Sequence, residues 1–158
     1  NRDDEINRQY FLLVRFIRST MVDRRLAGIF NLENIDILDY RIAGNILETA
    51  GDTIVDLSES ITDTSLSSTD QKKIYEIAKD IENIQKKAID AFITNNRSLA
   101  IEAIKLHGQH QEKVSKIRSS LEHKKQTPIA FLDLIYIFEK IAQSWSDISD
   151  LVQPTYRK

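Results

Sequence analysis

The chain has 158 residues, no cysteine, and 22 basic against 24 acidic residues, which leaves a net charge of −2. This composition excludes disulfides, thiolate metal sites and cysteine nucleophiles, and the balanced charge argues against nucleic-acid contact by this segment. Hydrophobic residues make up 41% of the sequence, whereas only four glycines and two prolines occur, so we expect an all-α protein. No apolar run is long enough to span a bilayer, and we expect a cytoplasmic protein without membrane insertion.

Two helices are predicted in the N-terminal part of the chain. The first runs from about Asp3 to Leu26, because apolar residues recur there at helical spacing. Asn31 is expected to cap the second helix, whose apolar positions continue to Ile61. The polar tract at residues 62–69 predicts the loop that follows.

Two more helices are predicted after this loop. Ser68 and Gln71 fit a capping box at the start of the third helix, which continues to Phe92. A tight turn is expected at residues 95–98, and the fourth helix then extends to Leu121.

The fifth helix is predicted to begin at Thr127 and Pro128, a capping hydroxyl followed by a proline at the first position, and to end at Pro154. Trp145 lies on its apolar face and is assigned to the core. Because the connections are short, sequential helices are expected to pack antiparallel. The predicted fold is an antiparallel helical bundle that forms a single domain over residues 1–158.

One passage of the sequence occurs twice. Residues 47–59 align with residues 138–150 without a gap, at one constant offset. A duplicated helix is the simplest explanation, and it divides the chain into repeat halves of about 1–66 and 67–158.

The repeated helix carries a row of carboxylates along one side. At 100° per residue, Glu48, Asp52 and Asp56 fall within an arc of about 80°, nearly opposite the apolar stripe, and therefore face outward. Glu139 and Asp147 occupy the matching arc of the second copy. Like charges one turn apart destabilise a helix, and a bound cation offsets that repulsion. The candidate metal ligands are therefore these five acids, and the alternative is a solvated helix face balanced by nearby basic residues.

Two histidines, His107 and His110, stand three positions apart on the predicted fourth helix. They could share Zn²⁺ or Ni²⁺, but no third ligand follows at a suitable spacing, and we expect a pair on the surface. The absence of a Glu-x-x-His motif disfavours a di-iron oxidase core, and no phosphate-binding loop or nucleophile elbow is present. We therefore assign no catalytic or cofactor-binding residue and do not expect an enzyme.

A family resemblance is carried by residues 42–59, with the sequence IAGNILETAGDTIVDLSE. This segment resembles the signature helix of the PhoU family of phosphate-uptake regulators, in which a Glu-x-x-x-Asp pair recurs once per half. Residues 5–15 are similar to the archaeal branch of that family. The resemblance implies two three-helix units in tandem. The five predicted helices match this arrangement if its first helix is missing from the sequence.

The resemblance also implies a metal site and a function. In the family, Glu/Asp pairs on the outer face bind divalent or trivalent metal ions, which implies iron, Zn, Mg or Mn here. Gln143 replaces the second acid in the last helix, so the copy around Glu48 and Asp52 is the better site. The implied protein regulates phosphate homeostasis by docking on proteins of phosphate uptake or sensing, and it is expected to form a homodimer.

Archaeal relatives often carry the module behind an AbrB-like DNA-binding domain. We therefore expect a preceding segment that binds DNA and gives the protein a role in transcription regulation. Two alternatives stay open from the residues themselves. One is a metal-dependent protein or metal store that uses Glu48, Asp52 and Glu139, and the other is a structural dimerisation module.

Overall fold

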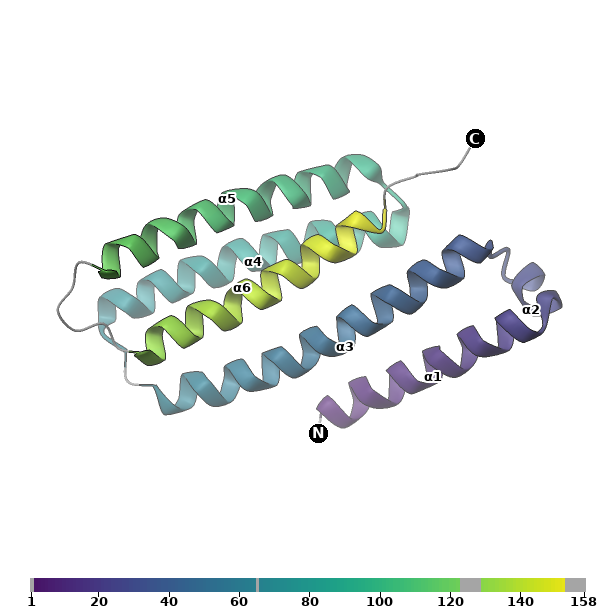
Figure 1. Cartoon of the computed structure of the whole chain (residues 1–158), viewed down its shortest axis with the longest axis horizontal. Helices are drawn as coiled ribbons and strands as arrows, with labels where there is room; N and C mark the ends of the chain where they lie inside the picture. The colour runs from purple at the N-terminus through teal and green to yellow at the C-terminus, as the bar shows by residue number, and fades with distance from the viewer. Residues whose placement is uncertain (1, 65, 123–128, 153–158) are drawn as a thin grey trace. The chain divides into compact units, whose positions relative to one another are not determined.

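A computed structural model describes residues 2–64, 66–122 and 129–152. Within these residues the chain is all-α, with antiparallel helices and no strand, as predicted. None of these helices combines the length and apolarity needed to cross a membrane. The helices, labelled in Figure 1, are α1 (Arg2–Val22), α2 (Arg24–Ile29), α3 (Asn34–Asp63), α4 (Ser68–Thr94), α5 (Arg97–Glu122) and α6 (Ile129–Asp150).

The chain divides into two compact units, Asn1–Asp52 and Thr53–Lys158. The division falls inside α3, so the first unit contains α1, α2 and the first part of α3. The remainder of α3 belongs to the second unit, together with α4, α5 and α6. A single domain with halves at 1–66 and 67–158 stays a prediction.

In the second unit, α4, α5 and α6 lie side by side along most of their length (Figure 1). Each buries one stripe of its surface. The α4 stripe recurs every three or four residues and consists of Ile74, Ile77, Ile81, Ile84, Ala88 and Ala91. Larger side chains enter the core from α6, namely Phe131, Leu134, Ile135, Phe138, Ile141, Trp145 and Ile148. The assignment of Trp145 to the core is confirmed.

The turn between α4 and α5 lies where it was predicted and is built by two asparagines. Asn95 adopts the left-handed conformation, with φ of 49°, and its backbone N–H donates to the carbonyl oxygens of Ala91 and Phe92. The side chain of Asn96 then accepts from the backbone N–H of Ser98 at 3.0 Å and caps α5. The turn is therefore tight, which places α5 directly against α4.

Helix starts differ from the predictions in two places. The cap of α4 is Ser67 and not Ser68, because the Ser67 hydroxyl accepts from the backbone N–H of Asp70 and donates to its carboxylate. Asn31 does not cap α3. It has a φ of 51° after α2, and the carboxylate of Asp36 caps the start of α3 by accepting from the Glu33 backbone N–H at 2.9 Å.

The first predicted helix is interrupted, and its predicted continuation to Leu26 is wrong. Asp23 adopts an extended backbone between α1 and α2, and its carboxylate accepts from the backbone N–H of Arg25 and pairs with the guanidinium at 2.8 Å. An aspartate that caps a new helix in this way ends the preceding one. Thr127, Pro128 and Pro154, which were predicted to delimit the last helix, lie outside the described residues.

In the first unit, α1 packs against the early part of α3 at two glycines. A Cβ atom at Gly44 would stand 2.7 Å from the Leu13 side chain, and one at Gly51 would stand 3.3 Å from Ile6. Alongside, the Tyr10 ring lies beneath the Arg41 guanidinium at 5.3 Å. The glycines therefore allow the two helices to approach closely.

The α4 stripe gives a prediction about stability. Ile77 is fully buried, so Ile77→Ala should lower the free energy of unfolding by about 2–5 kcal/mol through loss of buried apolar area and creation of a cavity. Ile93 on the same helix is 75% exposed. Ile93→Ala is the matched control and should change the free energy of unfolding by less than about 0.5 kcal/mol. Urea unfolding followed by Trp145 fluorescence measures both, and equal losses would show that the stripe is not the core.

Candidate functional site

The acids of the first repeat lie along α3. Asp52 and Asp56 are exposed, as the outward face predicts, whereas Glu48 is half-buried. Glu48 and Asp52 belong to the first unit, and Asp56 belongs to the second. None of the three forms an ion pair with another described residue. These carboxylates therefore remain available for a cation or a basic partner.

The acids of the second repeat are placed differently. Glu139 is half-buried and pairs with Arg118 of α5, and Asp147 accepts a hydrogen bond from the Gln143 side chain at 2.6 Å. Both carboxylates therefore lie at the edge of the α5–α6 contact and already have partners. Gln143, which aligns with Asp52 of the first repeat, is the neutral donor in this hydrogen bond.

The histidine pair is buried, and the prediction of a surface pair is wrong. His107 is 7% exposed and His110 is 2% exposed, and among the described residues neither ring nitrogen of His110 has a hydrogen-bond partner. Buried polar atoms without partners are uncommon, so this position calls for an explanation. Both rings line a groove of about 220 Å³ between α5 and α6, whose other lining residues are Gln111, Tyr136, Glu139, Lys140 and Gln143.

This groove joins two groups that lie well apart in the sequence. The histidines project from α5, and the acidic positions of the second repeat approach them from α6. Glu139 lines the groove, and the charge of Asp147 acts on His107. The groove therefore contains both imidazole and carboxylate side chains, contributed by two helices.

Burial dominates the protonation of both histidines. Removal from water lowers the pKa of His107, and the charges of Asp147 and Asp150 oppose this effect without reversing it. Burial likewise lowers the pKa of His110. The charge of Asp80 opposes this effect, whereas His107 and Lys113 lower the pKa further. Both imidazoles are therefore neutral at pH 7, and each has an unprotonated nitrogen with a free lone pair.

The sequence contained a signal for this burial. Along α5 the buried positions are Ala100, Ala103, His107, His110, Val114 and Leu121. Most of these positions follow one another at intervals of three or four residues, and both histidines are regular members of the stripe. If histidine is counted as a polar residue, the buried stripe is interrupted between Ala103 and Val114. The two histidines are then assigned to the surface, which is incorrect.

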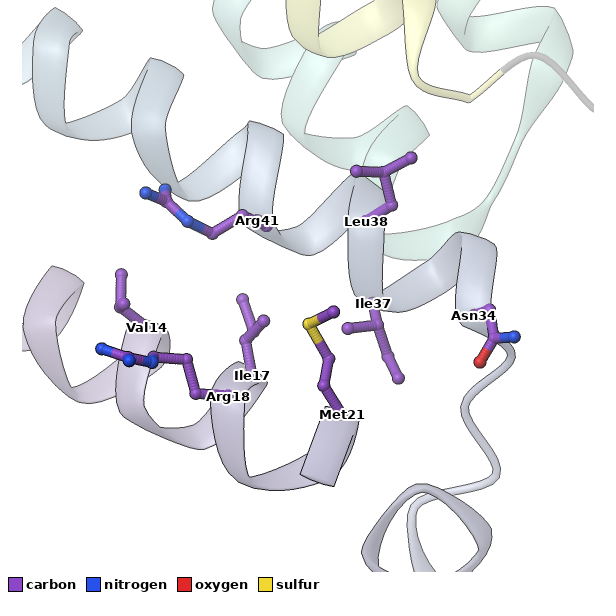
Figure 2. A pocket seen from close by; sticks show the side chains of 8 residues that line it. All are labelled: Val14, Ile17, Arg18, Met21, Asn34, Ile37, Leu38 and Arg41. Carbon is purple, nitrogen blue, oxygen red and sulfur yellow. The ribbon is translucent and has the colours of Figure 1, made fainter. Parts of the chain in front are cut away.

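The first unit has a different kind of site, formed by two apolar grooves along the α1–α3 pair. One has a volume of about 510 Å³ and is lined by Val14, Ile17, Arg18, Met21, Asn34, Ile37, Leu38 and Arg41. In Figure 2, Ile17 and Met21 of α1 point toward Ile37 of α3, and the two arginines project from either helix. The second groove, of about 290 Å³, also includes Ile17 and Ile37. The two isoleucines therefore form a common floor.

Across the described ranges, no group of three or more His, Asp or Glu side chains converges as metal ligands do. No protein-family model, curated protein or solved structure matches this chain. Its function must therefore be inferred from the residues and their geometry.

The neutral histidines give a prediction of pH dependence. Their folded-state pKa values lie below the ordinary value of about 6.5, so the unfolded chain binds protons first as the pH falls. The stability of the second unit should be constant above pH of about 6.5 and should fall below it, with a slope of at most about 1.4 kcal/mol per pH unit for each histidine. Urea unfolding followed by Trp145 fluorescence between pH 8 and 5 measures this dependence.

The matched control is the variant in which His107 and His110 are both replaced by glutamine. Its free energy of unfolding should lack the decline that begins at pH of about 6.5, because glutamine does not titrate. An unchanged decline in this variant would show that other groups control the pH dependence.

Proposed function

We propose that this chain is a regulatory helical protein that acts by binding other proteins through its first unit, and not an enzyme. One observation supports this proposal above the others: large apolar side chains of the first unit are exposed. Phe11 and Leu12 are each 61% exposed, and Met21 is 70% exposed. Exposed apolar surface of this extent is characteristic of interaction sites.

The first unit also buries little of its own surface. Among its described residues the buried ones are Ile17, Thr20, Ile37, Ala43, Gly44, Ala50 and Gly51, none of them aromatic. A unit of this size has a large surface relative to its volume and gains stability when a partner covers its apolar side chains. Binding and folding stability of the first unit are therefore expected to rise together.

The partner that fits this surface is a second copy of the chain. Residues 1–30 contain six arginines and four acids, whereas residues 31–52 contain five acids and one arginine. In a two-fold pair the arginine-rich helix of one copy can face the acid-rich helix of the other, so the surface complements itself. Two helical hairpins joined in this way make a four-helix bundle, a common stable arrangement.

The phosphate part of the proposal rests on the resemblance of residues 42–59 to the PhoU signature helix. The structure is compatible with it, since all of these residues lie in the single helix α3. The test is phosphate uptake in source cells with and without the gene. A change in uptake that depends on external phosphate supports this role, and identical uptake at all concentrations contradicts it.

A substitution in the larger groove tests the docking surface. Met21→Lys places a cation beside Arg18 and Arg41, both of which line that groove, and should weaken self-association about tenfold or more. Sedimentation velocity over a range of concentrations measures the dissociation constant. Ile93→Lys in α4, where the wild-type side chain is 75% exposed, is the matched control and should leave it unchanged. A wild-type chain that is monomeric throughout, or equal effects of the two variants, would contradict the proposed interface.

A further inference from the structure

The groove between α5 and α6 contains a side chain that lacks the partners its chemistry requires. His110 is 2% exposed, and both of its ring nitrogens are shielded from solvent and form no hydrogen bond with any residue that the structure describes. His107 lies one helical turn before it and lines the same groove. A buried imidazole loses hydrogen bonds to water on folding, so a ligand that engages its nitrogen restores what was lost.

The chemistry of the groove selects the class of ligand. Two imidazoles line it from α5, and α6 adds the carboxylate of Glu139 and the amide of Gln143. The ammonium group of Lys140 also lines the groove, and it lies over the Tyr136 ring at 4.8 Å. Imidazole nitrogen suits Zn²⁺ and similar transition-metal ions, whereas Mg²⁺ and Ca²⁺ prefer sites made of oxygen alone. We propose that the α5–α6 groove binds one Zn²⁺-type ion through His107 and His110, with Glu139 as the third protein ligand.

The protonation state of the two histidines agrees with this assignment. A metal ion binds the unprotonated nitrogen of a neutral imidazole and competes with protons for it. Because burial lowers the pKa of both rings, protons do not occupy the ligand nitrogens at neutral pH. The site is distinct from the exposed carboxylates of α3, which offer oxygen ligands and no imidazole.

The third ligand has a competing partner. Glu139 is paired with Arg118, and no three potential ligands among the described residues converge in this arrangement. Metal binding therefore requires two movements: the Glu139 carboxylate leaves Arg118, and the His110 ring turns one of its shielded nitrogens toward the ion. The side chains of Arg118 and Glu139 are 41% and 27% exposed, and ion pairs with this degree of solvent contact contribute little stability, so the exchange is feasible. Arg118 thus acts as a competitor for the metal ligand.

The experiment is a calorimetric titration of the full chain, without a histidine tag, with ZnCl₂ and separately with MgCl₂. Zn²⁺ should bind with a stoichiometry of one, and Mg²⁺ should not bind at this site. His107→Gln and His110→Gln should each weaken Zn²⁺ binding roughly tenfold or more, because each removes one ligand. Circular dichroism and Trp145 fluorescence without metal establish that each variant is folded, and His107→Gln alone decides the matter if His110→Gln does not fold.

Two further variants distinguish this site from adventitious binding and from the acids of α3. Arg118→Gln should strengthen Zn²⁺ binding several-fold, because it releases Glu139, and an adventitious surface site would not respond in this way. The double variant Glu48→Gln with Asp52→Asn should leave Zn²⁺ binding unchanged. The proposal is overturned if no saturable binding occurs, if the histidine variants bind as well as the wild type, or if binding is lost with the α3 acids instead.

Discussion

One packing constraint shapes the second unit: side chains that recur every three or four residues must fit a space shared by three adjacent helices. On α5 the buried stripe begins with two small residues, Ala100 and Ala103. On α6 the stripe contains large groups such as Phe131 and Trp145. Ala100 packs with Ala91 of α4 and with Val152, which follows α6, and such close packing leaves few voids. The order of the three helices, the tight turn between α4 and α5, and the burial of the histidines all depend on this arrangement.

The two units satisfy the same constraint to different extents. In the second unit three helices cover one another's apolar stripes, whereas in the first unit α1 packs on the early part of α3 and much apolar surface stays exposed. A third long helix makes the difference. The second unit can therefore hold a polar group such as His110 in a dry position, while the first presents surface suited to a partner.

Much of the fold follows from the sequence because apolar spacing predicts helices directly. All four long helical stretches of α3 to α6 were located in this way, and the asparagine turn was placed correctly. Local hydrogen bonding was harder to predict. Asp23 and Ser67 each accept a hydrogen bond from a backbone N–H near the start of a helix. Neighbouring polar residues can form the same bond, so tertiary packing decides which residue caps the helix.

The candidate site was predicted only in part, and the reason is physical. The repeat in the sequence identifies the acids Glu139 and Asp147. Arg118, which pairs with Glu139, and His107, on which the charge of Asp147 acts, lie on another helix. Helical periodicity predicts the direction in which a side chain leaves its own helix, but it does not predict which other helix lies on that side. The pairing of α5 with α6 therefore had to be seen in the structure before the acids and the imidazoles could be assigned to one groove.

The shared floor of the two grooves in the first unit has a consequence for regulation. Ile17 and Ile37 face both grooves, so a movement of either side chain changes the shape of the two grooves together. A ligand that occupies one groove and shifts these isoleucines thus changes the affinity of the other groove for its ligand. The effect is reciprocal. Ile17 and Ile37 are therefore the side chains through which occupation of one groove can affect the other.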